Sequence, residues 1–92
     1  MKYTIIYSNR FEKSLKKSYK RGLDIERLRE VLRILENGEK LPPKYKAHKL
    51  VGKYSGAREC HIQPDWLLVW EQNDTELILL LVETGTHSDI FG

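Results

Sequence analysis

The chain has 92 residues, and its 16 Lys and Arg against 13 Asp and Glu give a net charge of +3. This length predicts one domain, over residues 1–92, and the single cysteine excludes an internal disulfide. The first residues lack the apolar core of a secretory signal peptide, and the longest aliphatic run, Leu77–Val82, is too short to cross a membrane, which takes about 20 residues. We therefore expect a cytoplasmic protein with no membrane partner.

The first predicted elements are a strand and a helix. Residues 2–7 alternate polar and apolar side chains and are rich in β-branched and aromatic residues, which predicts a strand. Asn9, followed by Glu12 three residues later, resembles a capping box and predicts the start of a helix. One apolar stripe then follows helical spacing: Phe11, Leu15 and Tyr19.

A second helix is predicted to begin at Asp24, a good N-cap, and to end at Asn37-Gly38. Its apolar residues also follow helical spacing: Ile25, Leu28, Val31, Leu32 and Leu35. Because only a few residues separate the two helices, we expect an antiparallel helical hairpin. The prolines in residues 41–45 remove backbone donors and predict an extended connector.

Three further strands are predicted, over residues 57–62, 66–71 and 76–84, and the short turns between them favour antiparallel pairing. The last two strands are apolar on both faces, so we expect both faces to be covered. The helical hairpin covers one face, and loops, a bound partner or the chain ends cover the other. The predicted fold class is α+β, with an N-terminal strand and an antiparallel two-helix hairpin packed on a small antiparallel β-sheet.

Titratable side chains gather where these strands end. His61 and Asp65 flank one turn, and His87 follows the last strand. Antiparallel pairing places residues near 84–87 beside residues near 64–66, so we expect the three side chains to converge. Any one of these histidines alone is more often an ordinary surface residue.

Together, these side chains match the needs of RNA cleavage without a metal. In that reaction the 2′-hydroxyl attacks the neighbouring phosphate, which requires a base, an acid and a cation. Histidine has an ordinary pKa of about 6.5 and serves as either acid or base near neutral pH. Each well-placed acid or base contributes about 10²–10⁴ in rate. The set therefore predicts a small nuclease-like site.

Basic residues cluster in two stretches. Residues 10–21 hold six basic residues against one acidic residue, which fits a phosphate chain or an acidic partner and fits a solvated helix face equally well. The stretch after the prolines mixes lysines with tyrosines, which suits single-stranded RNA but is also ordinary loop composition. Its residues are Lys44, Tyr45, Lys46, His48, Lys49, Lys53 and Tyr54.

Other kinds of site have less support. Cys60 and His61 are neighbours on a strand and point to opposite faces, and no Cys-x-x-Cys pair occurs, so a zinc site is not expected. We interpret Cys60 as a small core residue. The absence of a Gly-x-x-x-x-Gly-Lys loop leaves nucleoside triphosphate binding without support.

Several motifs together resemble a known family. They are Tyr45, Ala47-His48-Lys49-Leu50, Gly52, Tyr54-Ser55-Gly56, Arg58, His61-Ile62, Pro64-Asp65-Trp66 and Thr84-Gly85-Thr86-His87-Ser88-Asp89-Ile90-Phe91. This pattern covers essentially the whole chain and is similar to the YafQ group of RelE-type bacterial toxins. The resemblance implies a RelE-like fold and a type II toxin that cuts mRNA in the ribosomal A site. It also implies a cognate antitoxin that holds the toxin inactive, and no metal or other cofactor.

The resemblance further implies roles for single residues. The acid–base and positioning groups are expected to be His48, His61, Asp65 and His87, and which is acid and which is base stays open. Phe91 is expected to stack on or orient a base. Relatives often carry an arginine where this chain has Glu83, so another cation is expected at the phosphate. The candidate substrate-binding cations are Lys49, Lys53 and Arg58.

Two other functions stay open. One is a binding toxin of the same fold that acts on a protein target such as DNA gyrase, as ParE-like relatives do, and such a toxin does not need three histidines. The other is a non-catalytic RNA-binding or regulatory domain. For that function we expect cell growth to continue unimpaired when the chain is induced without an antitoxin.

Overall fold

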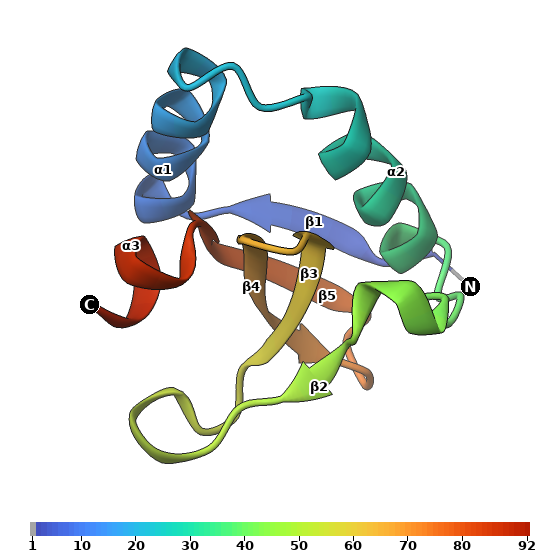
Figure 1. The fold of residues 1–92 in the computed structure, drawn as a ribbon. Helices are drawn as coiled ribbons and strands as arrows, with labels where there is room; N and C mark the ends of the chain where they lie inside the picture. Colours follow the sequence, from blue (N-terminus) through green and yellow to red (C-terminus); the bar gives the residue numbers. More distant parts are fainter. Residues whose placement is uncertain (1) are drawn as a thin grey trace.

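The computed structural model describes residues 2–92, so Met1 of the predicted domain lies outside the described residues. The strands are β1 (Thr4–Tyr7), β2 (His48–Lys49), β3 (Arg58–Gln63), β4 (Trp66–Asn73) and β5 (Ile78–Gly85). The helices are α1 (Asn9–Lys20), α2 (Ile25–Glu36) and the short α3 (His87–Phe91), and two 3₁₀ turns, η1 (Pro43–Tyr45) and η2 (Gly52–Tyr54), flank β2. Both long helices lie over one face of the sheet (Figure 1), which confirms the predicted α+β class.

The sheet has the strand order β1-β5-β4-β3-β2. The β3–β4 and β4–β5 pairs are antiparallel, as their short turns predict. β1, however, pairs parallel with β5, so the sheet is mixed rather than wholly antiparallel. Most of the chain lies between β1 and β5, and a connection of that length leaves either direction of pairing open. The expected extended connector instead forms η1 and the edge strand β2, which pairs with β3.

Side-chain caps set the starts of the two long helices. Ser8 Oγ accepts a hydrogen bond from Phe11 N at 3.0 Å, so Ser8 and not Asn9 caps α1. An N-cap residue needs extended backbone, which Ser8 has at φ −70° and ψ 157°, whereas Asn9 is already helical. Asp24 caps α2 as predicted, by accepting from Glu26 N at 3.0 Å. None of the helices within residues 2–92 has the length and apolar character that a membrane span requires.

Two apolar clusters lie on opposite faces of the sheet. The larger lies between the sheet and the helices α1 and α2 and includes Phe11, Leu28, Val31, Trp66, Leu68 and Trp70. The smaller consists of Ala57, Leu67, Val69 and Ile90. Side chains of β4 thus alternate between the two clusters, and α3 contributes Ile90 to the second one. Both faces of the central strands are therefore covered, as the apolar sequence predicts, and the second cover comes from α3 and the loop before β3.

Candidate active site

The sheet face opposite α1 and α2 carries a row of charged and titratable side chains. His48 on β2 lies opposite Glu59 on β3, which lies opposite Val69 on β4, which in turn lies opposite Glu83 on β5. Residues directly opposite one another project to the same face of a sheet. Because Val69 belongs to the smaller apolar cluster, this row lies on the face away from the long helices.

Glu59 connects two of the three histidines. Its side chain is nearly buried, and its Oε1 lies 3.3 Å from His48 Nε2 and 3.8 Å from His61 Nε2. The two imidazole ring centroids are 6.4 Å apart. The opposite nitrogen of each ring contacts a main-chain carbonyl, with His48 Nδ1 2.8 Å from Lys46 O and His61 Nδ1 3.2 Å from Pro64 O. Both rings are therefore oriented from two sides.

The main-chain contacts assign a hydrogen to one nitrogen of each ring. A carbonyl oxygen only accepts hydrogen bonds, so Nδ1 is assigned as the donor in both His48 and His61. Each Nε2 then faces the Glu59 carboxylate. Across residues 2–92, no three His, Cys, Asp or Glu side chains are grouped so as to hold a metal ion.

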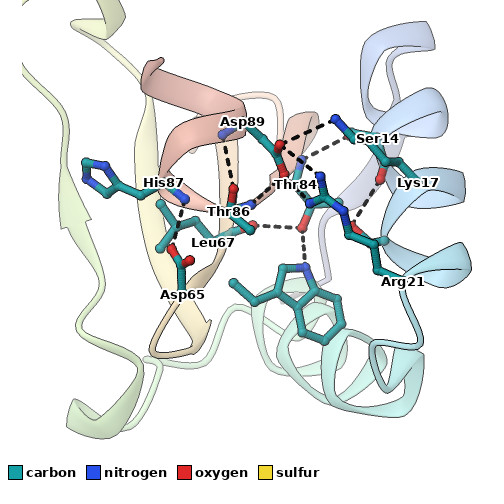
Figure 2. A network of polar contacts seen from close by, with 11 residues as sticks. Ser14, Lys17, Arg21, Asp65, Leu67, Thr84, Thr86, His87 and Asp89 are labelled. Atoms are coloured by element: carbon teal, nitrogen blue, oxygen red, sulfur yellow. Dashed lines mark hydrogen bonds and ion pairs between the residues drawn. The ribbon is translucent and has the colours of Figure 1, made fainter.

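The third histidine belongs to a second group, formed around α3. Asp65 Oδ1 accepts a hydrogen bond from His87 N at 3.0 Å, and Figure 2 shows the His87 imidazole directed away from that contact. The ring lies 4.8 Å from the ring of Phe91, measured between centroids. Phe91 in turn makes an edge contact with Tyr54 at 5.4 Å, and Tyr54 Oη donates to Ile90 O at 3.0 Å. Main-chain and aromatic contacts thus fix the position of His87.

The structure brings the predicted site residues together in these two groups rather than in one. Within residues 2–92 the rings of His61 and His87 do not touch, since His61 faces Glu59 and His87 contacts Phe91. Asp65 contacts the main chain of His87 rather than its imidazole. The groups are nevertheless neighbours on one face. His61 and Gly85 both lie opposite Leu67, so their backbones are about 10 Å apart, two strand spacings.

Two of the predicted cations lie beside this face rather than on it. Lys49 and Arg58 lie opposite one another across β2 and β3, and strand alternation directs them away from the face that carries Glu59. Arg58 Nη2 lies 3.7 Å from Asp74 Oδ2. Both cations line a groove of about 400 Å³ that His48 also lines. His48 therefore connects this groove with the histidine group.

Other cations lie near the second group. Lys53 Nζ is 5.7 Å from the centre of the Tyr54 ring, which itself contacts Phe91. Glu83 forms an ion pair with Arg10 of α1, with Arg10 Nη2 3.1 Å from Glu83 Oε1. Burial raises the pKa of the Glu83 carboxyl, and Arg10 opposes that rise. Relatives often carry an arginine at this position, whereas this chain has Glu83, whose charge is balanced by Arg10 of α1.

Sequence reasoning missed one member of the site, Glu59. Strand alternation places it on the same face as His61, but a single glutamate on a strand gives no sign of being buried. The signal that could have identified it is its pairing with His48, and that pairing depends on β2, which the sequence did not predict.

Comparison with known proteins gives the family. A family model described as "Bacterial toxin of type II toxin-antitoxin system, YafQ" matches residues 3–92. The chain is 37% identical over 89 residues to the mRNA interferase toxin YafQ of Escherichia coli K12, which covers 96% of this chain and 95% of the relative. The structure is similar to the crystal structure of YafQ from E. coli BL21(DE3), with a TM-score of 0.92, 35% identity and coverage of 98% of this chain and 99% of that one. It is also similar to a chain of the E. coli DinJ–YafQ toxin–antitoxin complex, with a TM-score of 0.90, 35% identity and coverage of 100% of this chain and 100% of that one. The chain therefore belongs to the YafQ family of toxins of type II toxin–antitoxin systems.

Proposed function

We propose that this chain is an endoribonuclease toxin that cuts mRNA in the ribosomal A site and is held inactive by a cognate antitoxin protein. The observation that carries the proposal is the pair of histidines oriented by buried Glu59, on the same sheet face as the helix that presents His87 and Phe91. The name of the E. coli relative, an mRNA interferase, supports the activity. The DinJ–YafQ complex of a relative supports the antitoxin as partner.

The reaction is attack by the RNA 2′-oxygen on the adjacent phosphorus. A base takes the 2′-hydroxyl proton as the new O–P bond forms, and an acid gives a proton to the 5′-oxygen as the P–O bond to it breaks. The products are a 2′,3′-cyclic phosphate and a 5′-hydroxyl. One histidine of the His48–Glu59–His61 group acts on one oxygen and His87 acts on the other, because the two groups stand apart on one face. Asp65 positions His87 by accepting from its main-chain N–H.

The remaining predicted residues bind the RNA. Phe91 leaves 37% of its surface exposed and stacks on a base beside the cut. Lys53 lies next to the Phe91 contact and supplies positive charge at the phosphate. Lys49 and Arg58 bind phosphates of the flanking nucleotides, in the groove that begins at His48.

The test is induction of the chain in bacteria, with mapping of mRNA 5′ ends. We expect the wild type to arrest growth and to produce new 5′ ends within codons, and co-expression of the antitoxin to suppress both effects. His87→Ala removes one acid–base group, so cleavage falls by about 10²–10⁴. Ser88→Ala is the matched control, because Ser88 is its exposed neighbour on α3.

The outcome also separates the nuclease from the alternatives. A His87→Ala variant that remains fully toxic contradicts the proposal. Inhibited DNA supercoiling by the purified protein, with no RNA cut, identifies a binding toxin instead. Unimpaired growth on induction without antitoxin identifies a non-catalytic domain.

A further inference from the structure

One stripe of α1 contacts the segment that carries His87. The stripe consists of Arg10, Ser14, Lys17 and the C-cap residue Arg21, spaced by four, three and four residues, so these side chains share one side of the helix. The basic stretch 10–21 is therefore not a uniformly solvated surface, because this part of it points at residues 83–89.

Each member of the stripe has a partner in that segment. Arg10 Nη2 lies 3.1 Å from Glu83 Oε1, and Thr84 N donates to Ser14 Oγ at 3.1 Å. The other two members bind Asp89. Lys17 Nζ lies 3.4 Å from Asp89 Oδ1, while Arg21 donates twice, from Nη1 to Oδ2 at 2.5 Å and from Nη2 to Oδ1 at 3.2 Å (Figure 2).

Asp89 also holds the start of α3 together. Its Oδ2 accepts from Thr86 N at 2.9 Å, and its own N–H donates to Thr86 Oγ1 at 3.1 Å, a reciprocal capping box. Gly85 permits this approach, because a Cβ at that position would lie 2.9 Å from Asp89 Oδ2. Arg21 and the Thr86 N–H hold the pKa of the Asp89 carboxyl well below its usual range, so the carboxylate stays charged at neutral pH.

From this geometry we infer that Arg21 is a positioning residue, which acts through Asp89 to fix α3 and the His87 and Phe91 that it presents. A helix of five residues does not hold its shape by itself, so α3 depends on its cap and its tertiary contacts. Asp65 fixes the His87 N–H on the other side of the same turn. The inference rests on the proposed function, because it assigns Arg21 to the alignment of a cleavage site.

The competing interpretation is an ordinary surface ion pair. Isolated pairs of exposed charges contribute little, because solvent screens them and long side chains lose freedom. This pair differs in two respects. Its two N–H donors meet both carboxylate oxygens, and one of those oxygens, Oδ2, also accepts from the Thr86 N–H at the start of the helix that carries His87.

The experiment compares Arg21→Gln with Arg21→Lys, which keeps the charge but not the two-donor geometry. Lys20→Gln is the matched control, because it removes a charge at the neighbouring, exposed position. Amide hydrogen exchange of residues 87–91 is measured together with cleavage of ribosome-bound mRNA. In Arg21→Gln we expect exchange at α3 to accelerate by about tenfold or more. We expect kcat to fall by about ten- to a hundredfold, because His87 is displaced, and KM to rise, because the Phe91 that stacks on a base lies on the same helix.

Arg21→Lys is expected to restore part of the exchange protection of α3 and part of kcat. Lys20→Gln is expected to match the wild type in exchange and in kcat. Unchanged exchange at α3 in Arg21→Gln overturns the inference, and so does faster exchange with an unchanged kcat. A wild-type chain that cuts no RNA overturns the proposed function, while the exchange measurement still decides whether Arg21 holds α3.

Discussion

The Glu59 carboxylate is buried, which is unusual for a charged side chain. It is 4% exposed, and its Oε2 is buried without a hydrogen-bond partner among the described residues. Burying a charged group without full compensation costs free energy. Groups that reduce stability in this way are often retained for function. Under the proposed function, Glu59 orients His48 and His61, both within 3.8 Å of its Oε1.

Glu59→Gln is expected to separate stability from activity. The amide keeps the shape and removes the buried charge, so thermal stability stays level or rises. Cleavage of ribosome-bound mRNA falls by about ten- to a hundredfold, because the two rings lose the carboxylate that orients them. Glu71→Gln on β4 is the control, because Glu71 is exposed. A variant that keeps wild-type cleavage while retaining its fold excludes a role for this carboxylate.

At the level of single residues, the sequence identifies which side chains could act in a reaction more readily than it identifies what they contact. His48, His61, Asp65 and His87 were named from residue type, turn position and resemblance, and the structure places all four on or beside one sheet face. Their catalytic roles stay predictions. What residue type does not reveal is that Asp65 binds a main-chain N–H, since that contact depends on where α3 begins.

Among the elements, α1 and β5 meet at an ion pair in which only the carboxylate is buried. The Glu83 side chain is 10% exposed, whereas Arg10 is 61% exposed. Burial raises the pKa of Glu83, and Asp89 adds to that rise while Arg10 and Lys17 oppose it. A carboxyl with a raised pKa in the folded state favours folding when protonated. Its contribution to stability is therefore present below its ordinary pKa of 4.5 and is lost as pH rises through the folded-state value.

Glu83→Gln is accordingly expected to raise the free energy of unfolding at pH 7 by about 1 kcal/mol. The gain should disappear below pH 4, where Glu83 is protonated in both states. Arg10→Gln should act in the opposite direction at pH 7, because it leaves the buried carboxylate uncompensated. Urea denaturation of both variants at the two pH values measures the differences. A loss of stability in Glu83→Gln at pH 7 means that the attraction to Arg10 exceeds the cost of burial.

Local patterns predicted most elements, and tertiary contacts decided the remainder. Asp24 and the apolar spacing defined α2, and short turns defined the β3–β4–β5 pairing. α3 was missed although Thr86 and Asp89 have capping-box spacing, because a five-residue helix is stable only with its partners on α1. The two-residue strand β2 was missed for the same reason, since it exists only by pairing with β3.

Across the whole molecule, the main apolar core and the candidate active site lie on opposite faces of the sheet. The large core lies under α1 and α2, whereas the histidines lie on the face with the smaller cluster. Cys60 shows the division on one strand. It lies between Glu59 and His61 in the sequence, but its side chain is fully buried in the large core on the opposite face. Substitutions at the histidine face can therefore be judged for activity with the main core intact, provided that the core is monitored independently.

Cys60 provides that measurement. Burial raises the pKa of its thiol to about 12, and the Glu59 carboxylate adds to the rise, so the folded protein presents almost no thiolate. Alkylation by iodoacetamide at pH 8 should be at least about a thousandfold slower in the native protein than in urea, because the folded state of a small domain predominates by that margin. The chain has one cysteine, so mass spectrometry reads the rate directly. The urea dependence of this rate should follow the circular dichroism transition in the wild type and in the His87→Ala, Arg21→Gln and Glu59→Gln variants. Rapid alkylation of a chain with native circular dichroism contradicts the placement of Cys60 in the core, since the thiol is then reached without unfolding.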